Sequence, residues 1–344
     1  MMDIARAAGV SQSTVSRILN NVTSPVLIVP ETRERVLATA RRLNYSPNPL
    51  ARALRGAPTM LIGAIVRDIT DPFFLTGIDA LSREVIARGY NVVLGHAHAR
   101  AKEAIALKGV LEARHCDAIV LLGDMRDQLR LIADLHETRI PVIAMWQGTK
   151  LKGIRSVNVD NEAGIEAVVR HLLELGHTRL AFIGSRPMGD HRDRQEAFIA
   201  AVERTGIRVP KRYLQDATNS PLGGSQAISA LLRIRDLPTA IVAGNDQLAI
   251  GALHAAHRLG LRVPEDLSIT GFDDLPMAAY SVPSLTTVHM PVEEMVAAAV
   301  RMIFDRSGDP GLDPMATATL TPTLIVREST GPAPQRVTTA QPQP

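Results

Sequence analysis

Three features of the sequence predict an α/β fold with parallel sheets, preceded by a small all-α module. The 344 residues are 46% hydrophobic but only 3% aromatic, so the core is expected to consist of Val, Ile, Leu and Ala. Up to residue 55 every periodic segment has helical spacing. From residue 60 onward, short apolar runs alternate with helical stretches, which is typical of parallel sheets covered by helices.

The all-α module is predicted to contain three helices, at residues 2–8, 11–20 and 31–43. Gly9 ends the first, and Ser11 is well placed to cap the second. Two short helices around a glycine-containing turn form a helix-turn-helix arrangement. The residues expected to face inward are Ile4, Ala5, Ala8, Val15, Ile18, Leu19, Val36, Ala40 and Leu43.

A short hinge helix is expected to follow this module. Pro47 and Pro49 prevent helix 31–43 from continuing, and Pro49 can begin a new helix that ends near Gly56. Residues 1–58 hold eight arginines and three acidic residues, a balance of +5 that leaves −2 for the rest of a chain with net charge +3. A basic module on a mildly acidic body indicates nucleic-acid binding, although a solvated helical face remains the alternative.

The body is predicted to form two α/β lobes, because about 270 residues is long for one sheet. Its expected strands are the apolar runs 60–66, 91–94, 118–122, 140–145, 179–184, 239–243 and 267–272. Its expected helices lie near 72–88, 100–114, 126–137, 161–175, 190–205, 223–234 and 246–259. Ligands of open parallel sheets bind at the carboxyl ends of the strands, here between the lobes. The tail 331–344 has four prolines and no apolar periodicity, so it is expected to be disordered.

Several function classes are disfavoured by what the sequence lacks. No apolar run approaches the roughly 18 residues of a membrane span, and the first residues do not have the pattern of a signal peptide. A single cysteine, Cys116, allows no intrachain disulfide, which indicates a reducing, cytoplasmic setting. No catalytic motif stands out, so we expect no enzyme, cofactor or metal. A metal held by His96 and His98, a transport-type binding protein and a sugar or nucleoside enzyme remain as alternatives.

The order of motifs resembles the LacI/GalR family of bacterial transcriptional regulators over roughly residues 2–330. The resemblance is carried by ARAAGVSQSTVSRILN near the N-terminus, PETRERVLATARRLNYSPNPLARALR after it, Asp71-Pro-Phe-Phe74, Val159-Asp-Asn-Glu-Ala-Gly164, Gly244-Asn-Asp246, Val263-Pro-Glu-Asp266, Gly271-Phe-Asp-Asp274 and Pro283-Ser-Leu-Thr-Thr287. It implies a homodimeric repressor that binds a roughly palindromic operator in double-stranded DNA under the control of a small-molecule effector.

The resemblance also implies a domain plan. Residues 1–47 would be the DNA-binding domain, 48–58 the hinge helix and linker, and 59–330 a periplasmic-binding-protein-like core. One lobe of this core would comprise 59–158 with 289–322, and the other 159–288 with 323–330.

By the same resemblance, specific residues would contact the operator. Gln12, Ser13 and Arg17 would read bases, which suits amide, hydroxyl and guanidinium groups in a major groove. Leu54 would enter the minor groove as an apolar wedge, unless it merely packs against the body. The DNA backbone would be contacted by Ser11, Thr14, Ser16, Asn20, Tyr45, Arg52 and Arg55.

The effector, expected to be a sugar or sugar derivative, would be bound by a second set of residues. These are Asp71, Phe73, Phe74, Trp146, Arg194, Asn245 and Asp273. Buried sugar hydroxyls need paired polar groups, which Asp, Asn and Arg supply. Trp146 stands where many relatives have an acidic residue, and it could stack on a sugar face or a flat ring. The neighbouring Asp246 and Asp274 fit caps and turns equally well.

Overall fold

The structure is a computed structural model, and it describes residues 1–19, 28–43, 45, 58–97, 116–125, 129–137, 140–146, 154–186, 188–304 and 317–335. The chain divides into two compact units, Met1–Met60 with Ala113–Asp117, and Leu61–Glu112 with Ala118–Pro344. Asn20, Arg52, Leu54 and Arg55, the helix expected at 100–114 and most of the hinge segment lie outside the described residues.

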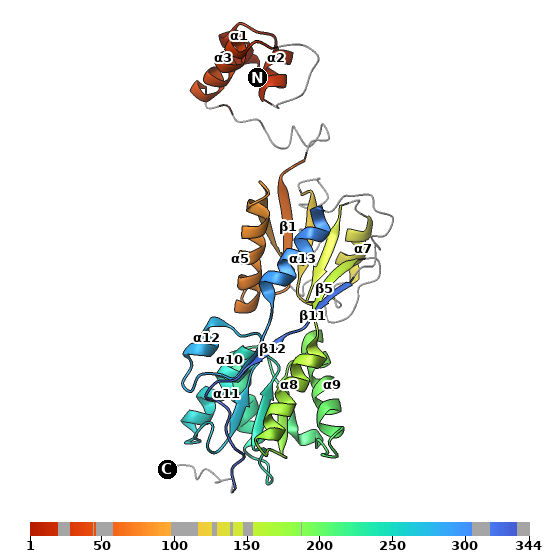
Figure 1. Cartoon of the computed structure of the whole chain (residues 1–344), viewed down its shortest axis with the longest axis vertical. Coiled ribbons are helices and arrows are strands. Elements are labelled where there is room, and N and C mark those ends of the chain that lie inside the picture. Colours follow the sequence, from red (N-terminus) through yellow and green to blue (C-terminus); the bar gives the residue numbers. More distant parts are fainter. Residues whose placement is uncertain are drawn as a thin grey trace. The chain divides into compact units, whose positions relative to one another are not determined.

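The first unit contains three helices, α1 (Met2–Ala8), α2 (Gln12–Leu19) and α3 (Pro30–Arg42), labelled in Figure 1. Their shared core is apolar and comprises Ile4, Ala8, Val15, Ile18, Val36 and Ala40. The predicted helical module is therefore confirmed. The prediction that Leu43 is buried is wrong: Leu43 follows the end of α3 and is 44% exposed, while Thr39 takes a buried place on the helix.

The turn between α1 and α2 has the geometry that its sequence indicates. Gly9 adopts a left-handed conformation with φ 64°, which ends α1 without the steric cost of a Cβ atom. The hydroxyl of Ser11 accepts a hydrogen bond from Thr14 N at 3.2 Å and so caps α2. Arg35 Nε of α3 donates to Ala8 O at 2.9 Å, which ties the third helix to the turn.

The second unit holds a six-stranded, all-parallel sheet with the order β11-β5-β4-β3-β1-β2. Its strands are β1 (Leu61–Val66), β2 (Asn91–His96), β3 (Ala118–Leu122), β4 (Val142–Met145), β5 (Arg155–Val159) and β11 (Thr317–Leu320). Alternate side chains of β1 and β3 face opposite layers. One layer contains α5 (Pro72–Ile86) and α13 (Val292–Phe304), and the other contains α7 (Leu129–Glu137). Figure 1 shows this sheet between α5 and α7, with α13 crossing it.

A smaller parallel sheet in the same unit has the order β7-β6-β8-β9. Its strands are β6 (Leu180–Gly184), β7 (Leu214–Asp216), β8 (Ala240–Ala243) and β9 (Ser268–Thr270). The helices around it are α8 (Asn161–Glu174), α9 (Gly189–Glu203), α10 (Pro221–Leu231), α11 (Asp246–Arg258) and α12 (Pro276–Tyr280), with a short 3-10 turn at Lys211–Tyr213. The antiparallel pair β10 (Thr287–His289) and β12 (Thr323–Ile325) completes the fold. The chain crosses between the two sheets after β5, after β10 and after β11, so two α/β lobes share several connections.

The predicted disorder of the tail is wrong for its first residues. Gly331 is buried, and its carbonyl lies 2.9 Å from His177 Nε2. Ala333 N donates to Leu175 O at 2.8 Å, so the chain past residue 330 packs on the second lobe. Backbone groups that pair with the protein order this stretch despite its two prolines. Residues 336–344 lie outside the described part of the chain.

Across the helices that the structure describes, none combines the length and the apolar character that a membrane crossing requires.

Candidate functional site

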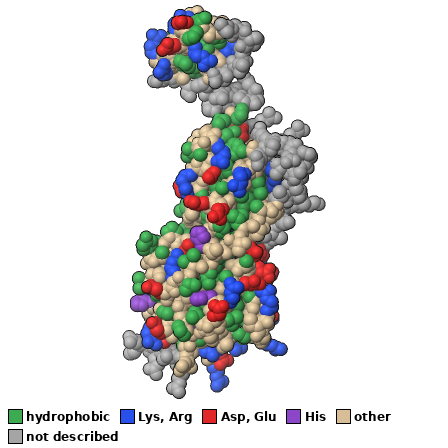
Figure 2. All heavy atoms as spheres, viewed as in Figure 1, with side chains coloured by type: hydrophobic (Ala, Val, Ile, Leu, Met, Phe, Trp, Pro, Cys, Tyr) green, Lys and Arg blue, Asp and Glu red, His purple; other side chains and the backbone are tan. Residues whose placement is uncertain are grey.

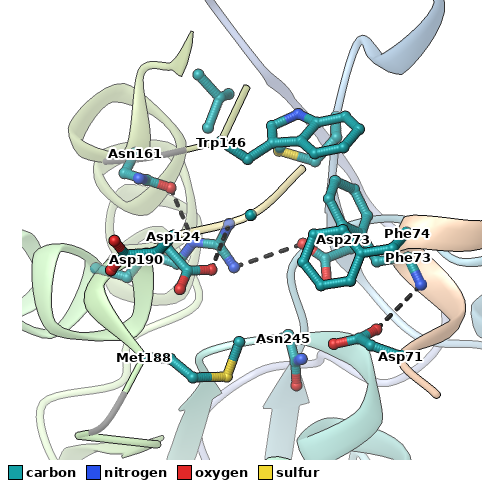
Figure 3. A pocket seen from close by; sticks show the side chains of 14 residues that line it. Asp71, Phe73, Phe74, Asp124, Trp146, Asn161, Met188, Asp190, Asn245 and Asp273 are labelled. Atoms are coloured by element: carbon teal, nitrogen blue, oxygen red, sulfur yellow. Dashed lines mark hydrogen bonds and ion pairs between the residues drawn. The ribbon is translucent and has the colours of Figure 1, made fainter. Parts of the chain in front are cut away.

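All seven residues predicted to bind an effector line one pocket of the second unit, shown in Figure 3. Most of them follow the carboxyl ends of strands: Asp71, Phe73 and Phe74 after β1, Trp146 after β4, Asn245 after β8 and Asp273 after β9. Arg194 reaches the pocket from α9. Two parallel sheets that present their carboxyl ends to each other create a site of this kind.

Further lining residues were not identified from the sequence: Gly123, Asp124, Val159, Asn161, Met188, Asp190 and Met290. Asp124 follows β3 as Asp71 follows β1, so the strand-end argument could have found it. Asp190 and Asn161 lie in the first turns of α9 and α8. Asp190 is four residues before Arg194 on the same helix, so helical spacing could have found it, whereas the three-dimensional arrangement brings Asn161 to the pocket.

Arg194 is held in place by protein groups on several sides. It is only 3% exposed, and its guanidinium carbon lies 3.6 Å from the centre of the Phe272 ring. Its Nε donates to Asn161 Oδ1 at 2.8 Å, and its Nη1 donates to Gly244 O at 2.6 Å. Two carboxylates complete its surroundings: Asp273 at 3.5 Å and Asp190 at 3.8 Å. The arginine therefore organises the pocket floor through fixed hydrogen bonds.

Two carboxyl groups of the pocket, those of Asp273 and Asp71, have pKa values above the ordinary range. Burial raises the pKa of Asp273 strongly, although Arg194 acts in the opposite direction. Asp273 also adopts φ 116°, a conformation that is costly for a side chain other than glycine. Burial likewise raises the pKa of Asp71, against hydrogen bonds from Phe73 N and Asn219. Strained and desolvated acids of this kind are characteristic of functional sites.

A chain of hydrogen bonds links the two lobes beside the pocket. Asp71 caps α5 by accepting from Phe73 N, and its second oxygen accepts from Asn219 Nδ2 at 3.0 Å. Asn219 in turn accepts from Asn245 Nδ2 at 2.8 Å, while Asn245 caps α11 by accepting from Leu248 N. Asp71 and Asn245 thus have structural partners, and Asn219, which lies in a loop before α10, was not predicted.

An aromatic cluster forms one wall of the pocket. The ring of Phe73 lies edge-on to Trp146 at 4.8 Å and to Phe74 at 5.6 Å between ring centres. Trp146 Nε1 donates to Met295 Sδ of α13 at 3.2 Å, and a Cβ atom on Gly77 of α5 would overlap the indole. The indole is therefore fixed by both helices. Since the chain has one tryptophan, its fluorescence reports directly on this pocket.

Structural roles are observed for Asp246 and Asp274. For these two residues the sequence had left roles in caps and turns open as an alternative to effector contact. Asp246 accepts from Leu275 N at 2.7 Å and from the Thr287 hydroxyl. Asp274 pairs with Arg327 at 2.7 Å and with His289 at 2.9 Å. These contacts connect the end of β9 to strand β10 and to the segment after β12.

Asp246 makes the stability of the protein depend on pH. Burial raises the pKa of this carboxyl to about 7, against hydrogen bonds from Thr287 and Leu275. The folded state therefore holds a proton that the unfolded state releases near pH 4, and the free energy of unfolding falls as pH rises from about 4 to 7. Asp246→Asn is expected to remove this pH dependence. The free energy of unfolding of the variant, relative to that of the wild type, should therefore rise by about 2–3 kcal/mol between pH 5 and pH 8.

Urea unfolding of both proteins at the two pH values measures this difference. The exposed Asp236→Asn serves as the control for removal of a carboxyl group from the surface. A difference that stays constant from pH 5 to 8 would contradict the role assigned to Asp246.

The described residues contain no group of three or more metal-ligating side chains. His98 lies outside the described residues, so a metal held jointly with His96 is not tested.

The residues predicted to read DNA bases begin at the start of α2. Gln12 and Ser13 are exposed there, whereas Arg17 is half-buried. Of the residues predicted to contact the DNA backbone, Ser11 caps α2 and Tyr45 packs against the core of the module. Thr14 and Ser16 are half-buried on α2. Figure 2 shows basic side chains over the surface of this module, and the exposed arginines are Arg6, Arg33, Arg35, Arg41 and Arg42. These positions are compatible with DNA contact, which stays a prediction.

Comparison with known proteins gives matches over nearly the whole chain. Residues 1–48 match the family "Bacterial regulatory proteins, lacI family", and residues 169–330 match a periplasmic binding protein-like domain. The HTH-type transcriptional repressor PurR of Erwinia tasmaniensis is 33% identical over 97% of both chains, and PurR of Yersinia pestis is 32% identical over 97% of both.

Two solved structures are similar over most of their length. The Lac repressor dimer bound to operator and the anti-inducer ONPF has a TM-score of 0.83 and 26% identity, over 96% of this chain and 98% of that one. The complex of the transcriptional regulator CelR with cellobiose has a TM-score of 0.71 and 27% identity, over 95% and 98%. These relatives confirm the predicted fold class and the prediction of a regulator rather than an enzyme.

Proposed function

Because this chain belongs to the LacI family and is a DNA-binding transcriptional repressor with a small-molecule effector, we propose that its effector is a sugar or sugar derivative bound in the pocket of Figure 3. The observation that carries the proposal is the convergence of the seven residues on one pocket between the lobes. The repressor is proposed to act in the cytoplasm, where its operator lies.

The chemistry of the lining suits a small polyol. Carboxylate and amide oxygens of Asp190, Asp273 and Asn161 can accept hydrogen bonds from hydroxyls, and a buried hydroxyl requires such a partner. The aromatic wall offers apolar surface to the C–H face of a sugar ring. The same wall could stack on a flat heteroaromatic ring, which is the alternative effector class.

Titration of the Trp146 fluorescence with monosaccharides and disaccharides tests the effector class. The expected result is saturable binding of at least one sugar, accompanied by a change in operator affinity. Saturable binding of nucleobases, with no response to any sugar, would overturn the assignment in favour of a flat heteroaromatic effector.

For the operator complex, we propose that two copies of the chain bind a roughly palindromic site, one helical module per half-site. Gln12, Ser13 and Arg17 would contact bases in the major groove. Leu54 would open a central base step, and the backbone contacts would come from Ser11, Thr14, Ser16, Asn20, Tyr45, Arg52 and Arg55. The proposal is supported by the match of residues 1–48 and by the operator-bound Lac repressor dimer.

The second unit offers an apolar surface for pairing of two copies. Helices α10 and α12 pack on one core cluster, and around them the exposed apolar side chains are Leu222, Met277, Tyr280 and Val282. Tyr280 is 80% and Val282 93% exposed. Figure 2 shows hydrophobic side chains gathered over α12. Exposed apolar side chains that cluster in this way are typical of an interface.

Tyr280→Asp is expected to turn the homodimer into monomers, because a carboxylate would have to be desolvated in the contact. Sedimentation equilibrium measures the change, and Tyr280→Phe, which preserves the apolar ring, should leave the dimer intact. If Tyr280→Asp still formed dimers with unchanged affinity, the interface would have to lie elsewhere.

A further inference from the structure

The ionisable side chains of the effector pocket are mostly acidic. Among its described lining residues, four are acidic, namely Asp71, Asp124, Asp190 and Asp273, and Arg194 is the single basic one. Burial raises the pKa of Asp71 and of Asp273, so these two groups hold their protons more tightly than exposed carboxyl groups do. A negatively charged ligand would meet more carboxyl groups than cations here, whereas hydrogen-bond donors would find acceptor oxygens.

Arg194 is shared among several protein groups. Its Nε and Nη1 donate to Asn161 and to Gly244, and its Nη1 also lies 3.5 Å from Asp273. Its Nη2 lies 3.8 Å from Asp190. An anionic ligand that approached Nη1 or Nη2 would therefore lie next to the carboxyl group of Asp273 or of Asp190.

Asp190, by contrast, has an unused acceptor. Within the part of the chain that the structure describes, its Oδ1 is one of two buried side-chain polar atoms that lack a hydrogen-bond partner. Burial acts to raise the pKa of Asp190, whereas the positive charge of Arg194, 3.8 Å away, favours the charged form of this carboxyl group. Figure 3 shows Asp190 on the side of the pocket near Asp124 and Asn161.

The other unpartnered atom belongs to the next residue of α9. His191 Nδ1 accepts from Ser185 N at 3.0 Å, so the proton of a neutral ring is on Nε2. Burial lowers the pKa of His191 to about 4, and the ring is neutral at physiological pH. It therefore supplies no positive charge that could attract an anion to this end of α9.

We propose that the effector has no negative charge and donates a hydrogen bond from a hydroxyl or ammonium group to Asp190. This inference rests on the proposed effector site. Asp190 is then the residue that makes the repressor respond to a free sugar or amino sugar and ignore sugar phosphates and sugar acids. A donor at this position supplies the missing partner of Oδ1, whereas a phosphate or carboxylate there would face the carboxyl group of Asp190.

Matched sets of ligands test the charge rule on the wild-type protein. Each set contains one sugar in its neutral, amino, phosphorylated and acid forms, for example glucose, glucosamine, glucose 6-phosphate and glucuronate. Fluorescence titration of Trp146 gives the affinity of each. Within any set that binds, the anionic forms should bind at least about 100-fold more weakly than the neutral or amino form.

Substitution of Asp190 identifies the residue and the donor. Asp190→Asn should weaken binding of a neutral sugar about 10-fold and of an amino sugar more, since an ammonium loses a charged partner. Glu196→Gln, an exposed substitution on the same helix, should leave both affinities unchanged. The difference between the effect of Asp190→Asn on amino-sugar affinity and its effect on neutral-sugar affinity shows whether an ammonium or a hydroxyl group donates to Asp190. Asp190→Ser serves as a second variant should Asn fail to fold.

Three outcomes would overturn the inference. A sugar phosphate or sugar acid that binds the wild type as tightly as its neutral form contradicts the charge rule while leaving the sugar assignment intact. Unchanged affinity in Asp190→Asn contradicts the role of this residue. If no sugar of any charge binds, the proposed effector class fails and the inference fails with it.

Discussion

Replacing Arg194 with methionine is expected to abolish the effector response and to destabilise the second unit. The guanidinium is the partner of Asp190 and Asp273 and the donor to Asn161 and Gly244 O, all in or beside the pocket. Its removal leaves buried acceptors without a donor, which costs about 3–5 kcal/mol for a broken buried ion pair. The affinity for the effector should fall at least about 100-fold, because the pocket floor loses its order.

Urea unfolding and Trp146 fluorescence titration measure the two effects. Arg192→Met is the matched control on the same helix, because Arg192 is exposed and donates to Arg186 O at 3.1 Å, outside the pocket. Arg194→Met should still bind operator DNA and should no longer respond to effector. An unimpaired response would show that the pocket of Figure 3 is not the effector site.

Replacing Leu54 with alanine is expected to reduce specific operator affinity about 10–100-fold. The expectation rests on the motif that Leu54 shares with the family, since this residue lies outside the described part of the chain. Unstacking a base step costs a few kcal/mol, which an inserted apolar side chain offsets and alanine does not. Non-specific binding, which depends on phosphate contacts of the arginines, should be nearly unchanged.

Fluorescence anisotropy with operator and with random DNA separates the two kinds of binding. Leu54→Ile, which preserves the apolar volume, should retain most of the specificity. The affinity of the free protein for effector should be the same in all three proteins. Operator affinity that survives in Leu54→Ala would show that this segment is only a linker.

Where hydrophobic periodicity is strong, the sequence predicts the fold well. The buried stripe Ile4, Ala8, Val15 and Ile18 follows directly from helical spacing, and the buried runs of β3 and β6 follow from continuous apolar residues. Five strands were not predicted, because they are short or mix polar residues such as Asn158 with apolar ones: β5, β7, β10, β11 and β12. Helix α13 has an apolar spacing that could have revealed it.

The site was predicted only where a residue belongs to a recognisable motif. Asp71, Arg194, Asn245 and Asp273 were found in this way, and the structure brings them together. Asn219 was missed because its contact with Asp71 joins segments far apart in the chain. Asp190 lies four residues before Arg194 on α9, so helical spacing could have placed it beside the predicted arginine. In the first turn of a helix, the sequence alone does not distinguish an acidic residue that caps the helix from an acidic residue that faces a ligand.

Selection of binding sites from random DNA, followed by titration of the selected site with and without effector, tests whether the protein is an effector-controlled operator-binding repressor. We expect a two-fold symmetric site, an affinity that changes about 5–150-fold with effector, and a different selected sequence for Gln12→Ala. Selection that returned no preferred sequence, or a site whose affinity no pocket ligand alters, would contradict an effector-controlled operator-binding repressor.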